Sequence, residues 1–335
     1  MKPELRPFFS VHPYVDESVG GYMLRISEVN VGPTADQLLQ AVFGSKARFP
    51  FEQAGQFADY CRAAPSDVCT LSGYWQLHDG VDESMVGGFW IPRRPHIVRS
   101  CSALCPACLE DAPYSRAAWE IALVSCCPWH GTMLVDRCSQ CGLPISIRRK
   151  KVCQCRCGHD YREIRPDTVP EGAIKIAHNI NNIIWRSGKQ HSPLGMDLMN
   201  GVFYDVTPLI AFRHFWFLGV TFPAFVDGIP TYGQRTMSKA RSIYACEKAA
   251  LIMHDWPKSF FDQLEGLHRI RSREGIRVAE RVLRGMWQQI VMLTRDRDVI
   301  NMRSAFQPYV RSFITQAERR NSLKICINQR EFKFE

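Results

Sequence analysis

The stretch CPACLEDAPYSRAAWEIALVSCCPWHGTMLVDRCSQCG, residues 105–142, holds six cysteines and one histidine within 38 residues. Thiols at this density indicate disulfides, a catalytic nucleophile or metal sites. The N-terminal sequence MKPELRPFFSVHPYV has charges and prolines where a signal peptide carries its apolar segment. We therefore expect a cytoplasmic protein, in which thiols stay reduced and the 14 cysteines of the chain form no disulfide framework.

The first half of this stretch predicts one metal site. Cys105 and Cys108 form a C-x-x-C pair, and Cys127 and His130 form a C-x-x-H pair after a gap of eighteen residues. Zn²⁺ binds four nitrogen or sulfur ligands in a tetrahedron, and each short pair supplies two of them from one tight turn. Cys126 is a spare candidate, but the spacing favours Cys127 because it leaves two residues before His130.

A second metal site is predicted directly after the first. Cys138 and Cys141 form another C-x-x-C pair, and Cys155 and Cys157 lie in a C-x-C-G turn. Gly158 follows the last ligand, where a glycine lets the backbone turn toward the sulfurs. Four thiolates would complete this site. Three further residues are spare candidates: Cys101, Cys153 and His159.

Catalytic uses of these residues are not favoured. A catalytic zinc keeps one coordination position open, whereas both sets are complete at four protein ligands. The chain has no H-E-x-x-H, lacks the H-x-E of the zinc deaminases, and has no G-x-x-x-x-G-K-S/T phosphate loop. We therefore expect two structural Zn²⁺ ions and no enzymatic activity.

The chain of 335 residues is too long for one compact core, and we expect a mainly α-helical protein in three parts. Residues 1–95 are predicted to form a helix-turn-helix-like helical domain. Residues 96–165 form a tandem zinc-binding module of the zinc-finger or zinc-ribbon kind. Residues 166–335 form a C-terminal helical domain.

The N-terminal part carries several helix signals. Asp16 is predicted to cap the first helix, and Thr34 with Gln37 forms a capping box at the start of the second. Residues 53–77 predict two helices joined by a tight turn, the second of them capped by Ser66. Such a pair suggests a DNA-binding helix-turn-helix, although small helical bundles without a DNA role have the same pattern.

The C-terminal part is also expected to be helical. Residues 209–226 are the most apolar long stretch, but Arg213 lies within it, so a buried helix is favoured over a membrane span. A later helix must end or bend before Pro257. Residues 276–290 carry an apolar stripe that fits a core, with arginines on other faces that fit either solvent or a nucleic acid.

A run of basic residues separates the two halves of the second site. The net charge of the chain is +9, which permits nucleic-acid contact but does not require it. The run is either a solvated loop or a contact to phosphate groups. It consists of Arg148, Arg149, Lys150 and Lys151.

Several of these segments resemble the TniQ family, the target-selection proteins of heteromeric transposons. PYVDESVGGYMLRISEVN, residues 13–30, is similar to the opening motif of that family, with Arg25 in its place and Gly21 where serine is usual. The blocks CPACLEDAPYSRAAW and CPWHGTMLVDRCSQCG resemble its cysteine-rich centre. ACEKAALIMHDWPKSFFDQL resembles its late Trp-Pro element, so the resemblance spans roughly residues 13–265.

The resemblance implies a non-enzymatic adaptor that takes part in DNA integration. Family members link target DNA, or an RNA-guided Cascade complex of a CRISPR-associated transposon, to an AAA+ ATPase that recruits the DDE transposase. The length of the chain resembles that of the RNA-guided kind, in which the protein binds Cascade as a head-to-tail dimer. The alternative is a stand-alone zinc-containing DNA-binding transcriptional regulator, which would need a recognition helix.

Overall fold

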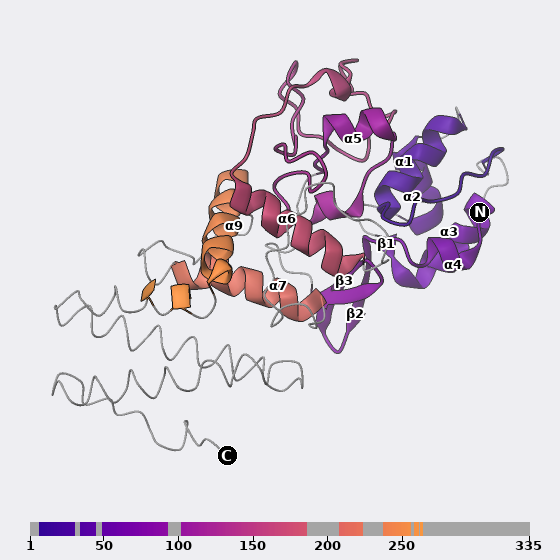
Figure 1. The fold of residues 1–335 in the computed structure, drawn as a ribbon. Helices are drawn as coiled ribbons and strands as arrows, with labels where there is room; N and C mark the ends of the chain where they lie inside the picture. The colour runs from indigo at the N-terminus through magenta and orange to yellow at the C-terminus, as the bar shows by residue number, and fades with distance from the viewer. Residues whose placement is uncertain are drawn as a thin grey trace, which may run out of the picture. The chain divides into compact units, whose positions relative to one another are not determined.

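The computed structural model describes residues 7–30, 34–44, 49–92, 102–185, 208–223, 237–255, 258–260 and 262–263 (Figure 1). The chain forms two compact units. One consists of Met1–Asp197 with Gly233–Glu247, and the other of Leu198–Tyr232 with Lys248–Glu335. The three-part division at residues 95 and 165 stays a prediction.

Helix α1 (Val19–Val29) begins at Ser18, whose side chain accepts a hydrogen bond from the Gly21 N–H. The prediction that Asp16 caps this helix is wrong. The carboxylate of Asp16 instead accepts hydrogen bonds from side chains about one hundred residues further along the chain. Tyr22 and most of the other side chains of α1 are buried, so the helix lies within the core of the first unit.

Helix α2 (Ala35–Phe43) begins with the capping box that the sequence predicted. The Thr34 side chain accepts from the Gln37 N–H, and the Gln37 side chain accepts from the Thr34 N–H. The helix ends at Gly44, which has a left-handed conformation with φ of 69°.

The predicted helix pair over residues 53–77 is only partly present. Helix α3 (Ala54–Cys61) is followed by α4 (Pro65–Val68), which has four residues and no side-chain cap. The prediction of a longer second helix capped by Ser66 is wrong, because α4 begins at Pro65 and the chain enters a β-strand at Tyr74. A helix of one turn is too short to serve as a recognition helix.

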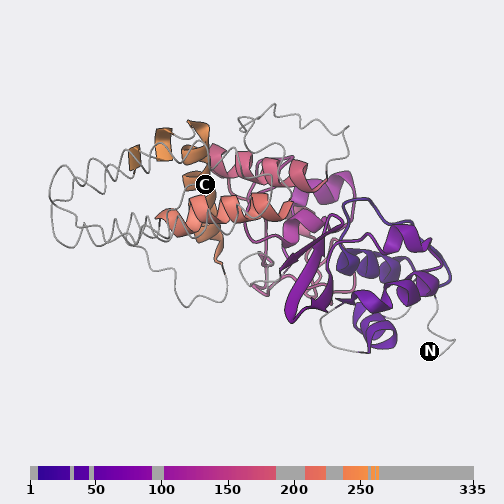
Figure 2. The ribbon, with the colours of Figure 1, turned by 90° about the horizontal axis from the view of Figure 1, so that it is seen from below.

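A small sheet follows, which the sequence analysis did not predict. Its four strands have the order β1-β2-β3-β4; β1 pairs with β2 in parallel, and the other pairs are antiparallel. The turns Asp79-Gly80 and Gly87-Gly88 have positive φ at both residues, as two-residue hairpins prefer. The strands lie beside the N-terminal helices in both views (Figure 1, Figure 2). Their bounds are Phe49–Pro50, Tyr74–His78, Val81–Val86 and Phe89–Pro92.

The cysteine-rich part consists mostly of loops and isolated β-bridges. It contains α5 (Pro106–Asp111) and two 3₁₀ turns at Ala117–Glu120 and Tyr161–Glu163. Helix α6 (Glu171–Ile184) follows it. Trp119, in the first 3₁₀ turn, is among the largest fully buried side chains.

Two later helices are described. Helix α7 (Pro208–Trp216) continues into a π-helical turn, Phe217–Thr221, and α9 (Lys239–His254) ends before Pro257 as predicted. Among the described residues no helix combines the length and the apolar character needed to cross a membrane. The predicted stripe at residues 276–290 lies outside the described residues.

The start of α9 completes the first unit. The Ser242 hydroxyl donates to the Ala122 carbonyl oxygen over 2.7 Å, and the Cys246 thiol donates to the Leu123 carbonyl oxygen over 3.1 Å. Ser242 and Cys246 are both buried. A segment that follows residue 232 is therefore part of the core around the cysteine-rich loops.

Candidate metal centres

The structure brings the eight residues predicted as ligands into two groups of four. In each group the ligand atoms all lie within 4.8 Å of one another. None of the described cysteines forms a disulfide. The first group contains Cys105, Cys108, Cys127 and His130, and the second contains Cys138, Cys141, Cys155 and Cys157.

The distances between the ligand atoms of the first group fit a tetrahedrally coordinated metal ion. The Nδ1 atom of His130 is 3.6 Å from the Cys105 sulfur, 3.3 Å from the Cys108 sulfur and 3.5 Å from the Cys127 sulfur. Zn–S bonds of about 2.3 Å place tetrahedral sulfurs about 3.8 Å apart, and a sulfur and a nitrogen slightly closer. The observed distances agree with that geometry to within a few tenths of an ångström.

Local structure explains how the first group is assembled. Cys105 immediately precedes α5, and Pro106 occupies the first position of that helix, so Cys108 lies one turn further on. The turn from Cys127 to His130 is closed by a backbone hydrogen bond from Gly131 to the Cys127 carbonyl oxygen. Gly131 has φ of 64°, which a glycine adopts without strain.

Burial favours a bound cation in the first group. The three cysteines are at most 1% exposed. Burial raises the pKa of the Cys127 thiol to about 12. A metal ligand must be the thiolate, so the negative charge at Cys127 needs a positive ion beside it.

One polar residue beside the first group was missed by the sequence analysis. The Nε2 atom of His130 is 3.3 Å from the Asp111 carboxylate, at the C-terminal end of α5. A carboxylate at the outer nitrogen fixes the orientation of a metal-binding imidazole and raises its basicity. The sequence signal is the position of Asp111, three residues after Cys108 on the same short helix.

The second group is more exposed than the first. The Cys138 and Cys157 sulfurs are 3.7 Å apart, as are the Cys141 and Cys155 sulfurs, which again fits a tetrahedron. Cys138 and Cys155 are buried, whereas Cys141 and Cys157 are exposed. Burial raises the pKa of Cys155, but hydrogen bonds from the Cys157 backbone and other groups outweigh it and bring the value to about 6.

The spare candidates lie outside both groups where they are described. His159 is 2.9 Å from the Ser139 hydroxyl and 3.6 Å from the Glu163 carboxylate, on opposite ring nitrogens. Cys126 is buried and Cys153 is half-buried, and neither joins a group. Cys101 lies outside the described residues.

The basic run has mixed surroundings. Arg149 is only 3% exposed, so its guanidinium is not available to a phosphate group. Arg148 is half-exposed and pairs with Asp36, its Nε atom 3.1 Å from the carboxylate. Lys150 and Lys151 are exposed. The prediction of a phosphate contact at Arg149 is therefore not supported, and for the other three residues it stays a prediction.

A cluster of polar and aromatic side chains connects the first group to the N-terminal helices. The Asp16 carboxylate accepts from the Tyr114 hydroxyl over 2.7 Å and from Arg116 over 2.6 Å. The Arg116 guanidinium also lies 4.3 Å from the centre of the Trp129 ring, between Cys127 and His130 in sequence. Arg116 thereby joins the start of α1 to the turn that carries two of the four ligand atoms.

A second ion pair lies within residues 13–30, which we call the opening segment. Glu17 is fully buried, and Arg25 donates to both of its carboxylate oxygens, over 2.9 and 2.7 Å. Arg25 also donates to the His12 carbonyl oxygen over 2.7 Å. Desolvation by burial raises the pKa of Glu17, and the hydrogen bonds from Arg25 oppose that effect.

The similar family motif usually has a serine where this chain has Gly21, and the crowding around this position explains the glycine. A Cβ atom at Gly21 would lie 2.5 Å from the Cβ atom of Ser115 and 3.0 Å from its carbonyl oxygen. The Ser115 carbonyl accepts from the Ser18 N–H over 3.0 Å, so this backbone is held close to α1. Glycine at position 21 is what allows that approach.

One of the comparisons with known proteins gives a match. The TniQ family model matches residues 8–134, which include the opening segment, the Arg116 cluster and all four residues of the first group. A comparison with curated proteins gives no match. The predicted resemblance is confirmed for residues 8–134, which match the model of the TniQ family, a family whose role is target selection in transposition.

Proposed function

We propose that this protein is a non-enzymatic target-selection adaptor of DNA transposition. It links a target, either DNA or an RNA-guided Cascade complex bound to DNA, to an AAA+ ATPase regulator. Through that ATPase it acts on the DDE transposase. The family match supports this proposal, and the observation that carries it is the position of Arg116 between Asp16 of the opening segment and Trp129 of the ligand turn.

The two groups of ligands are proposed to hold one Zn²⁺ ion each. The donor sets are three thiolates with one imidazole, and four thiolates, which are the sets that structural zinc sites use. Four protein ligands leave no coordination position for a substrate or a catalytic water. Bound zinc would contribute folding free energy to loops that contain little regular secondary structure.

A rigid centre gives an adaptor a fixed geometry. Arg116 and Tyr114 connect the first site to α1, and α9 packs through Ser242 onto the carbonyl of Ala122. Surfaces on these elements are therefore held at constant separation within the first unit. We propose that one such surface binds the target complex and another binds the ATPase.

The alternative function, a stand-alone transcriptional regulator, has less support. It needs a recognition helix that reaches base edges in the major groove. Helix α4 has four residues, and the chain continues into the β2–β3 hairpin. No other observation on the described residues favours this alternative.

A capture experiment tests the adaptor function. Target DNA, alone or bound by an RNA-guided Cascade complex, is immobilised, and retention of the AAA+ ATPase is measured with and without this protein. We expect retention to require the protein and to fall to background with Arg116→Ala, which uncouples the first site from α1. Arg162→Ala is the matched control, since Arg162 forms an exposed pair with Asp160.

Two results would overturn the proposal. One is tight, sequence-specific DNA binding by the isolated protein with no effect on the ATPase, which would favour the regulator. The other is DNA cleavage or strand transfer by the purified protein with Mg²⁺ or Mn²⁺, which would make it an enzyme.

A further inference from the structure

The loop between the two halves of the second group has a shape that is fixed from inside. We call residues 146–152 the basic loop. The buried Arg149 donates from Nη1 to the Ser146 carbonyl oxygen over 2.8 Å and from Nε to the Val152 carbonyl oxygen over 3.0 Å. Its guanidinium also lies 5.6 Å from the centre of the Tyr161 ring. One side chain therefore connects both ends of the loop.

A further contact joins the basic loop to α1. The Val152 N–H donates to the Glu28 carboxylate over 2.8 Å. Val152 is itself buried. The loop is therefore ordered by groups other than Lys150 and Lys151, and replacing those lysines leaves its supports in place.

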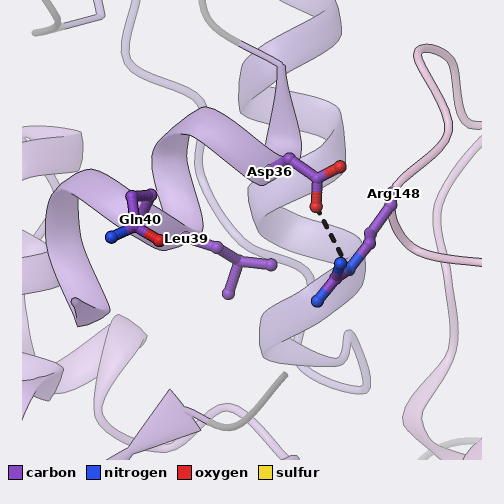
Figure 3. Close-up of a pocket in the computed structure, with 4 residues that line it drawn as sticks. All are labelled: Asp36, Leu39, Gln40 and Arg148. Atoms are coloured by element: carbon purple, nitrogen blue, oxygen red, sulfur yellow. Dashed lines mark ion pairs between the residues drawn. The ribbon is translucent and has the colours of Figure 1, made fainter. Parts of the chain in front are cut away.

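The exposed cations of this region differ in whether they are neutralised. Figure 3 shows Arg148 directed at Asp36, beside Leu39 and Gln40, so its charge is already paired. Lys150 and Lys151 are exposed, and within the described part of the chain neither has a carboxylate at ion-pair distance. Among the described residues, these two lysines are therefore the exposed cations of the loop that no carboxylate neutralises.

Arg156 adds a third cation beside the loop. Its Nη2 atom donates to the Arg148 carbonyl oxygen over 3.3 Å. Arg156 lies between Cys155 and Cys157, so it is well placed to offset the net negative charge of a zinc ion with four thiolates. Lys150 and Lys151 are separated from the nearest predicted ligand by several residues, and that role does not account for them.

We propose that the basic loop binds the phosphate backbone of a nucleic acid through Lys150 and Lys151, with Arg156 alongside. This inference deepens the proposed function, because it names the polyanion that the adaptor contacts and the residues that do so. The loop exposes no large apolar side chain, which the centre of a protein interface would need. Lysines on a pre-ordered loop position a phosphate backbone without reading its sequence.

The test compares two double variants of equal charge. Lys150→Gln/Lys151→Gln removes the proposed contacts. Lys175→Gln/Lys239→Gln removes two lysines of the first unit that are paired with Glu171 and Asp136. Binding to a mixed-sequence DNA duplex is measured by fluorescence anisotropy over a range of salt concentrations. Zinc content and thermal unfolding are measured for each variant.

We expect the loop variant to bind DNA at least tenfold more weakly, with unchanged zinc content and unfolding. The slope of log K against log salt should fall by about two, since each neutralised phosphate contributes about 0.9. The control variant should change neither quantity. A loop variant with the affinity and slope of the wild-type protein would overturn the inference, as would an equal loss in the control.

Two further arms distinguish a nucleic acid from an acidic protein, and the loop contact from the adaptor function. Polyglutamate at matched charge should compete weakly for the loop; competition equal to that of DNA would favour an acidic protein partner and overturn the inference. The loop variant is also used in the capture experiment. If it binds DNA as tightly as the wild-type protein and the Cascade-bound target still retains the ATPase, only the loop contact is refuted. If the wild-type protein fails to capture the ATPase but its DNA binding depends on the two lysines as expected, only the adaptor function is refuted.

Discussion

Arg116 and Asp16 are 100 residues apart in the sequence, and the Nη1 atom of one lies 2.6 Å from the Oδ2 atom of the other. Both side chains are mostly shielded from solvent, at 15% and 17% exposure. The same guanidinium packs on the rings of Tyr114 and Trp129. The opening segment and the first candidate metal centre are therefore directly connected, and the adaptor role proposed for the protein depends on this connection.

Removing the ion pair between Arg116 and Asp16 should destabilise the protein. Arg116→Ala leaves the Asp16 carboxylate without its cation and with only the Tyr114 hydroxyl. We expect the free energy of unfolding to fall by about 3 kcal/mol, because one member of a shielded ion pair is left unpaired. Urea denaturation measures the change, and a double-mutant cycle with Asp16→Asn measures the coupling.

Arg162→Ala provides the comparison, because Arg162 pairs with Asp160 at the surface. Exposed pairs contribute little to stability, since solvent screens their attraction. Equal losses from the two arginine variants would show that the shielded position of Arg116 has no special importance.

Gly21 should tolerate no side chain. Gly21→Ala places a methyl group 2.5 Å from the Cβ atom of Ser115. We expect a loss of about 2 kcal/mol, the usual cost of overpacking a core. Ser115→Gly in the same chain removes the closest atom and should recover part of that loss, which thermal unfolding of the double variant would measure.

Gly55→Ala is the matched control for Gly21→Ala. Gly55 also lies within a helix, and a Cβ atom there meets nothing within 4 Å. Alanine should stabilise the protein by up to about 1 kcal/mol, because alanine is the better helix former. If Gly55→Ala also lowered the stability, the loss in Gly21→Ala could not be attributed to its contact with Ser115.

The two metal centres should release their ions at different rates. We expect two zinc ions per chain by elemental analysis, and a chelator should remove one before the other. The second centre exposes Cys141 and Cys157, whereas the cysteines of the first are buried, so the second should be emptied first. A colorimetric zinc assay during chelation would show two phases.

Single-ligand variants assign those phases. Cys157→Ser should abolish the fast phase and leave the slow one, and Cys105→Ser should do the reverse with a larger loss of stability, because its site lies in the core. Release of both ions in one phase from the wild-type protein would contradict the difference in burial. Elemental analysis that finds no metal would contradict both sites.

Asp111 should strengthen zinc binding at the first centre, although it is not itself a ligand. Asp111→Asn removes the charge 3.3 Å from the outer nitrogen of His130. Zinc affinity at this centre should fall by about 10- to 100-fold, as it does for other outer partners of metal-binding histidines. Competition with a chelator of known affinity measures it. Glu110→Gln, a change at the exposed neighbouring carboxylate, should leave the affinity unchanged.

The correct sequence predictions were those that depend on short-range chemistry. The eight cysteine and histidine residues lie in two groups of four, as their spacing predicted, because C-x-x-C, C-x-x-H and C-x-C turns form within four residues. The capping box at Thr34 is equally local. Asp16 was misassigned as a cap because its partner, Arg116, is remote in sequence and outweighs the local preference.

The sheet was missed although part of its signal was present. Asp79-Gly80 and Gly87-Gly88 are strong hairpin turns, and they flank β3 (Val81–Val86). The helix expected over the preceding residues concealed them. Arg149 illustrates a different limit, since nothing in a run of four basic residues indicates which one the fold buries beneath the loop.

The contacts of α9 have a consequence for shortened forms of the gene product. Ser242 and Cys246 donate to carbonyl oxygens at Ala122 and Leu123, close in sequence to the first ligand turn. A polypeptide that stops at residue 197 would contain every cysteine of both centres but would leave those two acceptors uncovered. Premature termination late in the reading frame should therefore destabilise the cysteine-rich part, which is encoded well before the stop.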